Sequence, residues 1–446
     1  MTDKINEAIA NRLQQKGIST VQDRHLQQGK RCAFGDQGIC CRHCYMGPCR
    51  IRAKSPLGVC GATADTIVAR NFLRSIAAGC SAHSEHARKV VQTFQMAARG
   101  ELKNYQIQDE AKLLGLAAEV GVATKGRNIN DVAIDVGEVA IGEFGRPSGV
   151  SVFLKRAPAK RQEIWRRMGV EPRAIDREIV ESLHRSCVGV DQDYRNIMVQ
   201  GTRCALADGW SGSMWATELQ DVMFGTPRPI RSEVGLGVLD AEAVNIVVHG
   251  HDPLLAEMLA MATEEPDLVE MAHNAGAKSI NLAGICCTAN EMLLRHGIPV
   301  AGSFLQQEMA IATGVVDCMT IDVQCVMQSL GQLARRFHTE LITTSEQARM
   351  EGATHISFDH HPALESARKV IKIGIEAFGQ RQEDIHIPSQ RDPLVAGFTH
   401  ESLRYMLGGT FRSSYQPLND NIINGRISGI AGVVGCDNPK VGGGAT

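Results

Sequence analysis

The chain has 446 residues, of which 43% are hydrophobic and only 4% aromatic, so it is long enough for two or three domains with their own cores. The 47 Lys and Arg residues almost balance the 49 Asp and Glu residues, which leaves no positive field to attract nucleic acid or an anionic membrane. The first residues are charged, and no apolar run has the length of a membrane span. We therefore expect a soluble, cytoplasmic protein without a nucleic-acid partner.

From the N-terminus to residue 228 the pattern predicts a helical domain, because stretches such as Asn71–Gly100 are rich in Ala and poor in β-branched runs. Residues 229–385 alternate short apolar runs with helical segments, which predicts a Rossmann-like domain of parallel βαβ units. The predicted strands are Val244–Val248, Ser279–Leu282, Val315–Val323, Leu341–Thr344 and His355–Phe358. Because neither GxGxxG nor a P-loop follows a predicted strand, a nucleotide cofactor is not indicated.

Residues 386–446 predict the start of a second Rossmann-like α/β domain, with an apolar strand over Ile427–Val434. The Gly-rich tail that follows has no core-forming pattern. One strand with some helix cannot bury a core, so we expect this last domain to be incomplete.

The 14 cysteines are the first functional signal. A cytoplasmic chain keeps its thiols reduced, so metal ligation explains this number better than a disulfide framework. Six cysteines are concentrated near the N-terminus, and the other eight are dispersed; the six are Cys32, Cys40, Cys41, Cys44, Cys49 and Cys60.

The spacing within this N-terminal group suits iron–sulfur clusters. Cys41, Cys44, Cys49 and Cys60 already complete one set of four soft ligands. Cys32 and Cys40 remain, and they would form a second set together with the same loop of a symmetry mate, which predicts a homodimer. A structural zinc site with two incidental cysteines is the alternative. Several glycines in this stretch favour the clusters, because backbone must approach the inorganic sulfides closely.

Four further motifs follow predicted strands, and they span Val247–Pro253, Leu282–Glu291, Thr320–Met327 and Ala431–Lys440. Open parallel sheets place functional groups beyond the carboxyl ends of their strands, so these loops can converge into a site of His and Cys ligands. A single Cys after an apolar strand is more often a buried small hydrophobe. The combination of four such motifs argues for a metal site.

His83 and His86 are spaced to share one face of a helix and could pass protons. A solvated helix face is the alternative interpretation for this pair. Four other cysteines match no ligand motif, and we expect them in the core: Cys80, Cys187, Cys204 and Cys318.

The N-terminal cysteine stretch and the four later motifs, in this order from Arg31 to Lys440, resemble those of nickel-dependent anaerobic carbon monoxide dehydrogenases of the prismane and hybrid-cluster superfamily. The resemblance implies that Cys41, Cys44, Cys49 and Cys60 hold an internal [4Fe-4S] cluster, and that Cys32 and Cys40 hold a cluster shared across the dimer. It implies that a nickel–iron–sulfur active-site cluster is held by four ligands: His251, Cys287, Cys325 and Cys436. The neighbouring His249 and Cys286 are not ligands in this assignment, and core packing is preferred for Cys286.

The resemblance also implies a reaction, in which CO and water give CO2, two protons and two electrons. His83 would act in acid–base chemistry, and His86 would continue a proton path outward. Electrons would pass through the active-site, internal and dimer-bridging clusters to a ferredoxin-like acceptor. The family chain continues well beyond the position of Cys436 and there supplies two more cysteine ligands and a lysine, so activity of this shorter sequence is a separate question.

Three alternatives stay open. A hybrid-cluster-type oxidoreductase shares the general architecture, although the Cys40–Cys41 pair and the loop around His251 favour the dehydrogenase. An inactive electron-transfer fragment would hold only the N-terminal clusters, and the absence of nickel would identify it. A zinc-stabilised binding module would be colourless.

Overall fold

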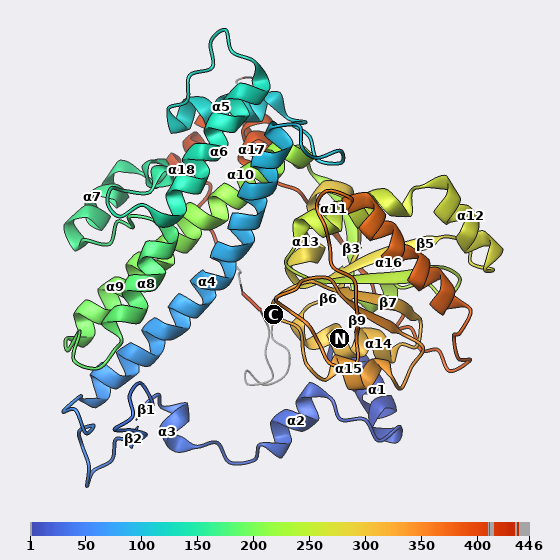
Figure 1. Cartoon of the computed structure of the whole chain (residues 1–446), viewed down its shortest axis with the longest axis horizontal. Coiled ribbons are helices and arrows are strands. Elements are labelled where there is room, and N and C mark those ends of the chain that lie inside the picture. The colour runs from blue at the N-terminus through green and yellow to red at the C-terminus, as the bar shows by residue number, and fades with distance from the viewer. Residues whose placement is uncertain (1, 409, 411–413, 433–434, 437–446) are drawn as a thin grey trace. The chain divides into compact units, whose positions relative to one another are not determined.

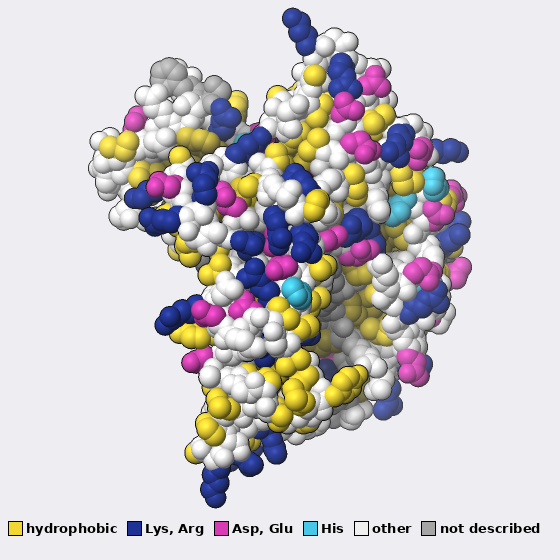
Figure 2. Space-filling model, turned by 60° about the vertical axis from the view of Figure 1, so that its left-hand side comes forward, with side chains coloured by type: hydrophobic (Ala, Val, Ile, Leu, Met, Phe, Trp, Pro, Cys, Tyr) yellow, Lys and Arg dark blue, Asp and Glu magenta, His cyan; other side chains and the backbone are white. Residues whose placement is uncertain are grey.

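The computed structural model describes residues 2–408, 410, 414–432 and 435–436. The chain forms two compact units (Figure 1): a helical unit, Gln28–Phe224, and a sheet unit, Met1–Gln27 with Gly225–Thr446. A helical region followed by a mostly parallel sheet with helices confirms the predicted fold class. Basic and acidic side chains are interspersed over the face shown in Figure 2, as the near balance of charges leads one to expect.

The helical unit is built around α4 (Ala64–Ala98), a helix of 35 residues. Thr63 caps its first turn by accepting a hydrogen bond from the Thr66 amide, which satisfies a backbone donor that has no partner within the helix. Its buried residues recur every three or four positions, the spacing that places them on one side. This buried stripe packs against α6, α8, α9 and α10.

The other elements of the helical unit are short and lie before or after α4. They are α3 (Ala33–Asp36), β1 (Cys40–Cys41), β2 (Cys49–Arg50), α5 (Glu110–Val120), α6 (Ile129–Gly145), the 3₁₀ helix η1 (Val152–Arg156), α7 (Ala159–Met168), α8 (Ile175–Arg185), α9 (Tyr194–Ala207), the π-helix η2 (Asp208–Gly212) and α10 (Ser213–Phe224).

The sheet unit contains eight strands in the order β10-β3-β6-β5-β4-β7-β8-β9, and only the β10–β3 pair is antiparallel in the part of the chain that the structure describes. The strands are β3 (Ile230–Val234), β4 (Val244–Gly250), β5 (Ile280–Ile285), β6 (Val300–Gly302), β7 (Val316–Ile321), β8 (Glu340–Thr343), β9 (Thr354–His355) and β10 (Asp392–Ala396). The helices are α1 (Thr2–Gln15), α2 (Val21–Gln27), η3 (Leu236–Val238), α11 (Pro253–Thr263), α12 (Pro266–Asn274), α13 (Cys286–His296), η4 (Phe304–Gln306), α14 (Gln307–Ala312), α15 (Leu330–Ala334), α16 (Ala363–Phe378), α17 (His400–Leu407) and α18 (Gln416–Ile423).

The central strands β4 and β7 are buried along their whole length. Neither strand alternates buried and exposed residues, because both faces of the sheet are covered at this point. Val247 belongs to a core shared with α1, α14 and α15, while the adjacent Ile246 faces Gly374 of α16 on the opposite side. The structure therefore has a helix layer on each face of the strands that precede the predicted site.

The two compact units differ from the predicted domain boundaries in two places. Residues 1–27 pack with the sheet unit: Ile9 and Leu13 are fully buried in its core, and Arg12 donates a hydrogen bond to the Ala312 carbonyl at 2.9 Å. Strand β10, predicted to lie in a separate last domain, extends the same sheet by pairing with β3. The sequence of an amphipathic helix or of a short strand does not indicate which unit it will pack against.

The C-terminal strand predicted over residues 427–434 does not form over residues 427–432, and residues 433–434 lie outside the described residues. The apolar run there is interrupted by Gly429 and Gly432, which weaken strand formation. Among the described helices, none combines the length and the apolar character needed to cross a bilayer.

Candidate metal centres

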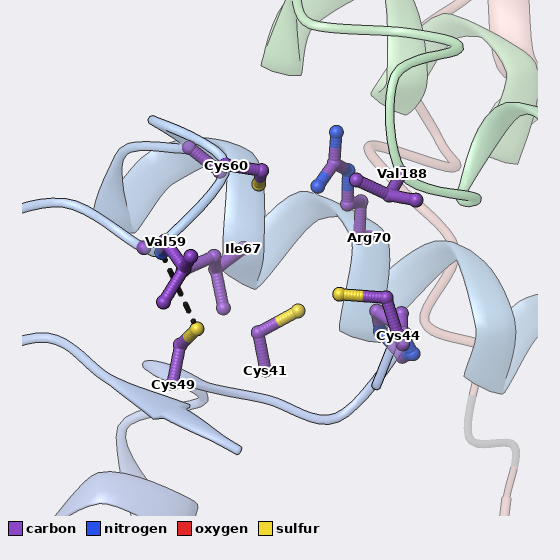
Figure 3. A pocket seen from close by; sticks show the side chains of 11 residues that line it. Cys41, Cys44, Cys49, Val59, Cys60, Ile67, Arg70 and Val188 are labelled. Carbon is purple, nitrogen blue, oxygen red and sulfur yellow. Dashed lines mark hydrogen bonds between the residues drawn. The ribbon is translucent and has the colours of Figure 1, made fainter. Parts of the chain in front are cut away.

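Four of the six N-terminal cysteines come together in the structure. Cys41, Cys44, Cys49 and Cys60 line one pocket of the helical unit (Figure 3). The Val59 amide donates a hydrogen bond to the Cys49 sulfur at 3.4 Å, a contact of the kind that stabilises thiolates bound to iron. The donor set is therefore complete for one cluster of the iron–sulfur type.

The chain reaches this arrangement through a tight local fold. Strands β1 and β2 pair antiparallel with Cys41 opposite Cys49. Gly47 lies between them where a Cβ would lie 3.0 Å from the Cys41 carbonyl oxygen, so the close approach of backbone in this turn favours glycine. Asn71 of α4 donates to the carbonyls of Gly38 (2.8 Å) and Cys40 (3.0 Å), which fastens this loop to the long helix.

Cys32 and Cys40 do not line this pocket: Cys32 is exposed and Cys40 is half-buried. A cluster shared by these two cysteines across a dimer stays a prediction.

The dispersed ligands lie in the sheet unit, beyond the carboxyl ends of three neighbouring parallel strands. His251 follows β4, Cys287 stands in the first turn of α13 directly after β5, and Cys325 lies in the loop after β7. An isolated parallel bridge between Gly250 and Cys286 holds the ends of β4 and β5 together. The sheet therefore brings together residues that are up to 74 positions apart along the chain (251 to 325).

Burial and neighbouring thiols raise the pKa of two cysteines at this edge. Burial raises the pKa of Cys287 to about 11, and negative charge at Cys436 and Cys325 acts in the same direction. Burial and Cys436 also raise the pKa of Cys325. Bound cations would reverse this effect, because positive charge favours the thiolate, so loading the site must release protons.

Within the described residues, no group of three or more His, Cys, Asp or Glu side chains is close enough to bind a single metal ion. A cluster imposes a different requirement, because each of its ligands binds a separate metal atom and the ligands stand farther apart. The soft and borderline donors at this edge suit iron, sulfur-bridged metals and nickel.

The backbone is unusual at the same edge. In the described part of the chain, the residues other than glycine with positive φ are Cys286 (64°), Gln324 (67°) and Cys325 (58°). Such conformations cost on the order of 1 kcal/mol each and persist where the surroundings impose them, commonly at functional sites. Gln307 is one such constraint, since its side-chain amide donates to the Cys325 carbonyl at 3.1 Å and accepts from the Met327 amide at 2.8 Å.

His249 and Cys286, which lie next to predicted ligands in the sequence, both pack within the sheet unit. His249 is fully buried, its Nε2 lies 2.9 Å from Oε1 of Gln307, and burial lowers its pKa to about 4. Its imidazole is therefore neutral near pH 7. Cys286 packs against the core of the sheet unit, as expected from the sequence.

In the helical unit, His83 and His86 lie on α4, as predicted; His83 is exposed and His86 is half-buried. Nδ1 of His83 lies 3.0 Å from each carboxylate oxygen of Asp208, the first residue of the π-helix. This hydrogen bond raises the pKa of His83 against the opposing effect of burial. Sequence reasoning missed Asp208, because 125 positions separate it from His83.

A second carboxylate missed from the sequence is Asp322, directly after β7. It is almost fully buried, and burial together with the charge of Asp252 raises its pKa to about 7, against the effect of backbone hydrogen bonds. The only signal in the sequence was its place at the end of an apolar strand.

The remaining cysteines follow the prediction with one exception. Cys80, Cys204 and Cys318 are buried, as expected for core residues. The prediction for Cys187 was wrong, because this residue is exposed after the end of α8, where its thiol donates to the Leu183 carbonyl at 3.3 Å.

Residues 39–446 match the model of the Prismane/CO dehydrogenase family, and the chain belongs to this family. Within it, the chain is similar to carbon monoxide dehydrogenases. It is 47% identical over 443 residues to carbon monoxide dehydrogenase 1 of Methanosarcina acetivorans, covering 98% of this chain and 70% of the relative. It is 41% identical to carbon monoxide dehydrogenase of Rhodospirillum rubrum, covering 99% of this chain and 69% of that protein.

Solved structures show the same fold. The chain superposes with a TM-score of 0.94 and 45% identity on a Ni-free crystal structure of carbon monoxide dehydrogenase from Thermococcus sp. AM4, covering 97% of this chain and 69% of that one. Carbon monoxide dehydrogenase IV from Carboxydothermus hydrogenoformans gives a TM-score of 0.94 at 41% identity, with 98% and 70% covered. The chain is thus homologous to carbon monoxide dehydrogenases over about 70% of their length.

Proposed function

We propose that this chain oxidises carbon monoxide with water to carbon dioxide, two protons and two electrons. The observation that carries the proposal is the placement of His251, Cys287 and Cys325 at the ends of three adjacent parallel strands. These donors occur in a chain that is 47% identical to a carbon monoxide dehydrogenase.

In this proposal His251, Cys287, Cys325 and Cys436 hold a nickel–iron–sulfur cluster. When bound, that cluster supplies Lewis-acid activation of CO and water and accepts the two electrons. Nδ1 of His251 lies 3.3 Å from the Val323 carbonyl, which can only accept, so this nitrogen carries the proton. The lone pair is then on Nε2, which becomes the ligand atom.

The protons released would be taken up by His83, which the Asp208 carboxylate orients through Nδ1. The same carboxylate favours the charged imidazolium and so raises the pKa of His83. His86, one helical turn farther along α4, would pass the proton outward.

Electrons would leave through an internal [4Fe-4S] cluster on Cys41, Cys44, Cys49 and Cys60. A second cluster, held by Cys32 and Cys40 of each protomer, would join two copies into a homodimer and deliver electrons to a ferredoxin-like acceptor. The convergence of the first four cysteines on one pocket supports this route. A cytoplasmic location stays a prediction.

The test is anaerobic purification after growth with nickel, followed by metal analysis and CO-dependent reduction of a viologen dye. Cys325→Ser removes a proposed ligand after β7, whereas Cys318→Ser changes a buried cysteine within β7. We expect at least about a tenfold loss of nickel and of CO oxidation in Cys325→Ser, while Cys318→Ser keeps both. Equal nickel in both variants, or wild-type protein with iron and no nickel, would overturn the proposal.

The second candidate is an electron-transfer protein that holds only the N-terminal clusters. Its support is that one complete set of four thiols is already assembled in the helical unit. Iron with the broad visible absorption of iron–sulfur clusters, but without nickel or CO oxidation, would establish this function instead.

A further inference from the structure

The Asp322 carboxylate joins the three strand ends that carry the proposed ligands. It is 1% exposed and directly follows β7. One oxygen, Oδ1, accepts hydrogen bonds from the amide of His251 at 2.6 Å and from the amide of Val323. The other, Oδ2, accepts from the Asp252 amide at 3.0 Å and from the Thr288 hydroxyl at 3.1 Å.

These donors belong to different loops. The two amides at 251 and 252 follow β4, and Thr288 stands beside Cys287 in the first turn of α13, after β5. The Asp322 amide in turn donates to the His249 carbonyl at 3.2 Å. One carboxylate therefore connects the loop of His251, the helix start of Cys287 and the strand that leads to Cys325.

The carboxylate fits closely against the backbone of Gly250. Gly250 has φ 139°, and a Cβ at this position would lie 1.9 Å from Oδ1 of Asp322. The missing side chain of Gly250 thus makes the space that the carboxylate fills. Replacing the carboxylate by an amide would put an NH2 group against an amide or hydroxyl donor and leave a buried backbone donor without a partner.

We propose that Asp322 is a positioning residue that holds His251 and Cys287 in ligating geometry before any metal arrives. The hydrogen bonds described above all join Asp322 to groups of this same chain. The inference rests on the proposed function for the identity of the ligands. The geometry that it concerns can be measured in the metal-free chain.

Asp317 provides a matched control on the same strand. It is fully buried near the opposite end of β7 and accepts from Arg381 Nε (2.7 Å), His338 Nε2 (2.9 Å) and the Asn245 amide (2.7 Å). Asp322→Asn and Asp317→Asn therefore each replace, on one strand, a buried carboxyl group that accepts several hydrogen bonds. Only the first change affects the proposed ligand loops.

The measurement is hydrogen–deuterium exchange of the metal-free chain, read at the amides of residues 251 and 252. We expect Asp322→Asn to speed their exchange by at least about tenfold, and Asp317→Asn to leave it near the wild-type rate. Equal acceleration in both variants, or none in Asp322→Asn, would overturn the proposal.

A gentler variant covers the case in which Asp322→Asn fails to fold. Thr288→Val removes one donor without changing charge or volume, and Thr313→Val removes a buried hydroxyl that bonds the Ala310 carbonyl elsewhere in the unit. We expect alkylation of Cys287 by iodoacetamide to rise at least about threefold in Thr288→Val and not in Thr313→Val. An unchanged rate in Thr288→Val contradicts the proposal.

Metal content separates this inference from the proposed function. If wild-type protein binds nickel, Asp322→Asn should lose it while keeping the iron of the N-terminal cysteines. If wild-type protein binds no nickel, the proposed function fails, and the exchange rates still decide whether Asp322 positions the loops.

Discussion

The two candidate centres reach their ligand sets by different routes. Cys41, Cys44, Cys49 and Cys60 lie within 20 positions of one another and meet through a two-stranded turn fastened to one helix. His251, Cys287 and Cys325 meet only because β4, β5 and β7 are neighbours in a sheet. The first centre depends on local backbone geometry, and the second depends on the core of a whole unit.

This difference has a physical consequence for each centre. A local site tolerates strain elsewhere in the chain, since its ligands are fixed by short-range contacts. A site at the ends of several strands moves whenever the strands move, so its geometry is sensitive to packing that lies far from the ligands. A destabilising substitution in the core of one unit should therefore cause loss of metal from the centre in that unit and not from the other centre.

The largest effect should come from paired cavity variants. Ile246→Ala opens a cavity in the sheet core, and Ile67→Ala opens one beside the cysteine pocket; both isoleucines are fully buried. We expect Ile246→Ala to lower the free energy of unfolding by about 3 kcal/mol and to empty the sheet-edge centre while the N-terminal iron remains. Ile67→Ala should instead cause loss of the N-terminal iron while the sheet-edge centre keeps its metal. Urea denaturation with nickel and iron analysis measures both, and loss of both metals in each variant would contradict the distinction.

A smaller effect should follow from filling the space next to Asp322. Gly250→Ala forces a Cβ to within 1.9 Å of a carboxylate oxygen at φ 139°, so we expect a loss of stability of about 2 kcal/mol or more. Gly379→Ala is the control, because its φ is −67° and its nearest contact would be 3.7 Å away. Thermal unfolding should leave that control within about 0.5 kcal/mol of wild type. A Gly250→Ala protein as stable as the control would contradict the close fit.

The smallest effect concerns protonation in the helical unit. Asp208→Asn should lower the pKa of His83 toward its ordinary value of 6.5, because the hydrogen-bonded carboxylate is what raises it. A histidine whose pKa is higher in the folded than in the unfolded protein stabilises the fold at pH values below its unfolded pKa. This stabilisation is lost as the pH rises through the folded pKa. The two proteins should therefore differ most at acidic pH and converge at alkaline pH.

Nuclear magnetic resonance of isotope-labelled histidine measures this titration directly. Asp176→Asn is the control, since that carboxylate binds Ser84 and Arg88 on the same helix rather than His83. The same His83 pKa in wild type and in Asp208→Asn would show that Asp208 does not orient a charged imidazole.

The sequence was informative where a residue's role depends on its near neighbours. The long helix α4, the central strands and the loop of four cysteines all follow from apolar periodicity, turn residues and spacing. The ends of β4, β5 and β7 were predictable because each apolar run is followed by a His or Cys. These features need only local information.

The features that escaped prediction depend on contacts between distant positions. Nothing around Asp208 or Asp322 indicates that one bonds His83 and the other joins three loops. The sequence of α1 predicts an apolar face but does not indicate which part of the chain that face packs against. Likewise, Leu394 and Val395 predict a strand but do not indicate that β10 extends the sheet of the preceding domain. Cys187 was expected in the core, but its place after a helix end leaves it exposed.

The pairing of residues 1–27 with the sheet unit has a consequence for the order of events during synthesis. Ile9 and Leu13 are made first, yet their partners Ala310 and Ile311 emerge from the ribosome about 300 residues later. At ordinary elongation rates this interval is on the order of tens of seconds, during which residues 28–224 are already complete. The first helix of the chain therefore waits for its packing partners while an entire unit is made.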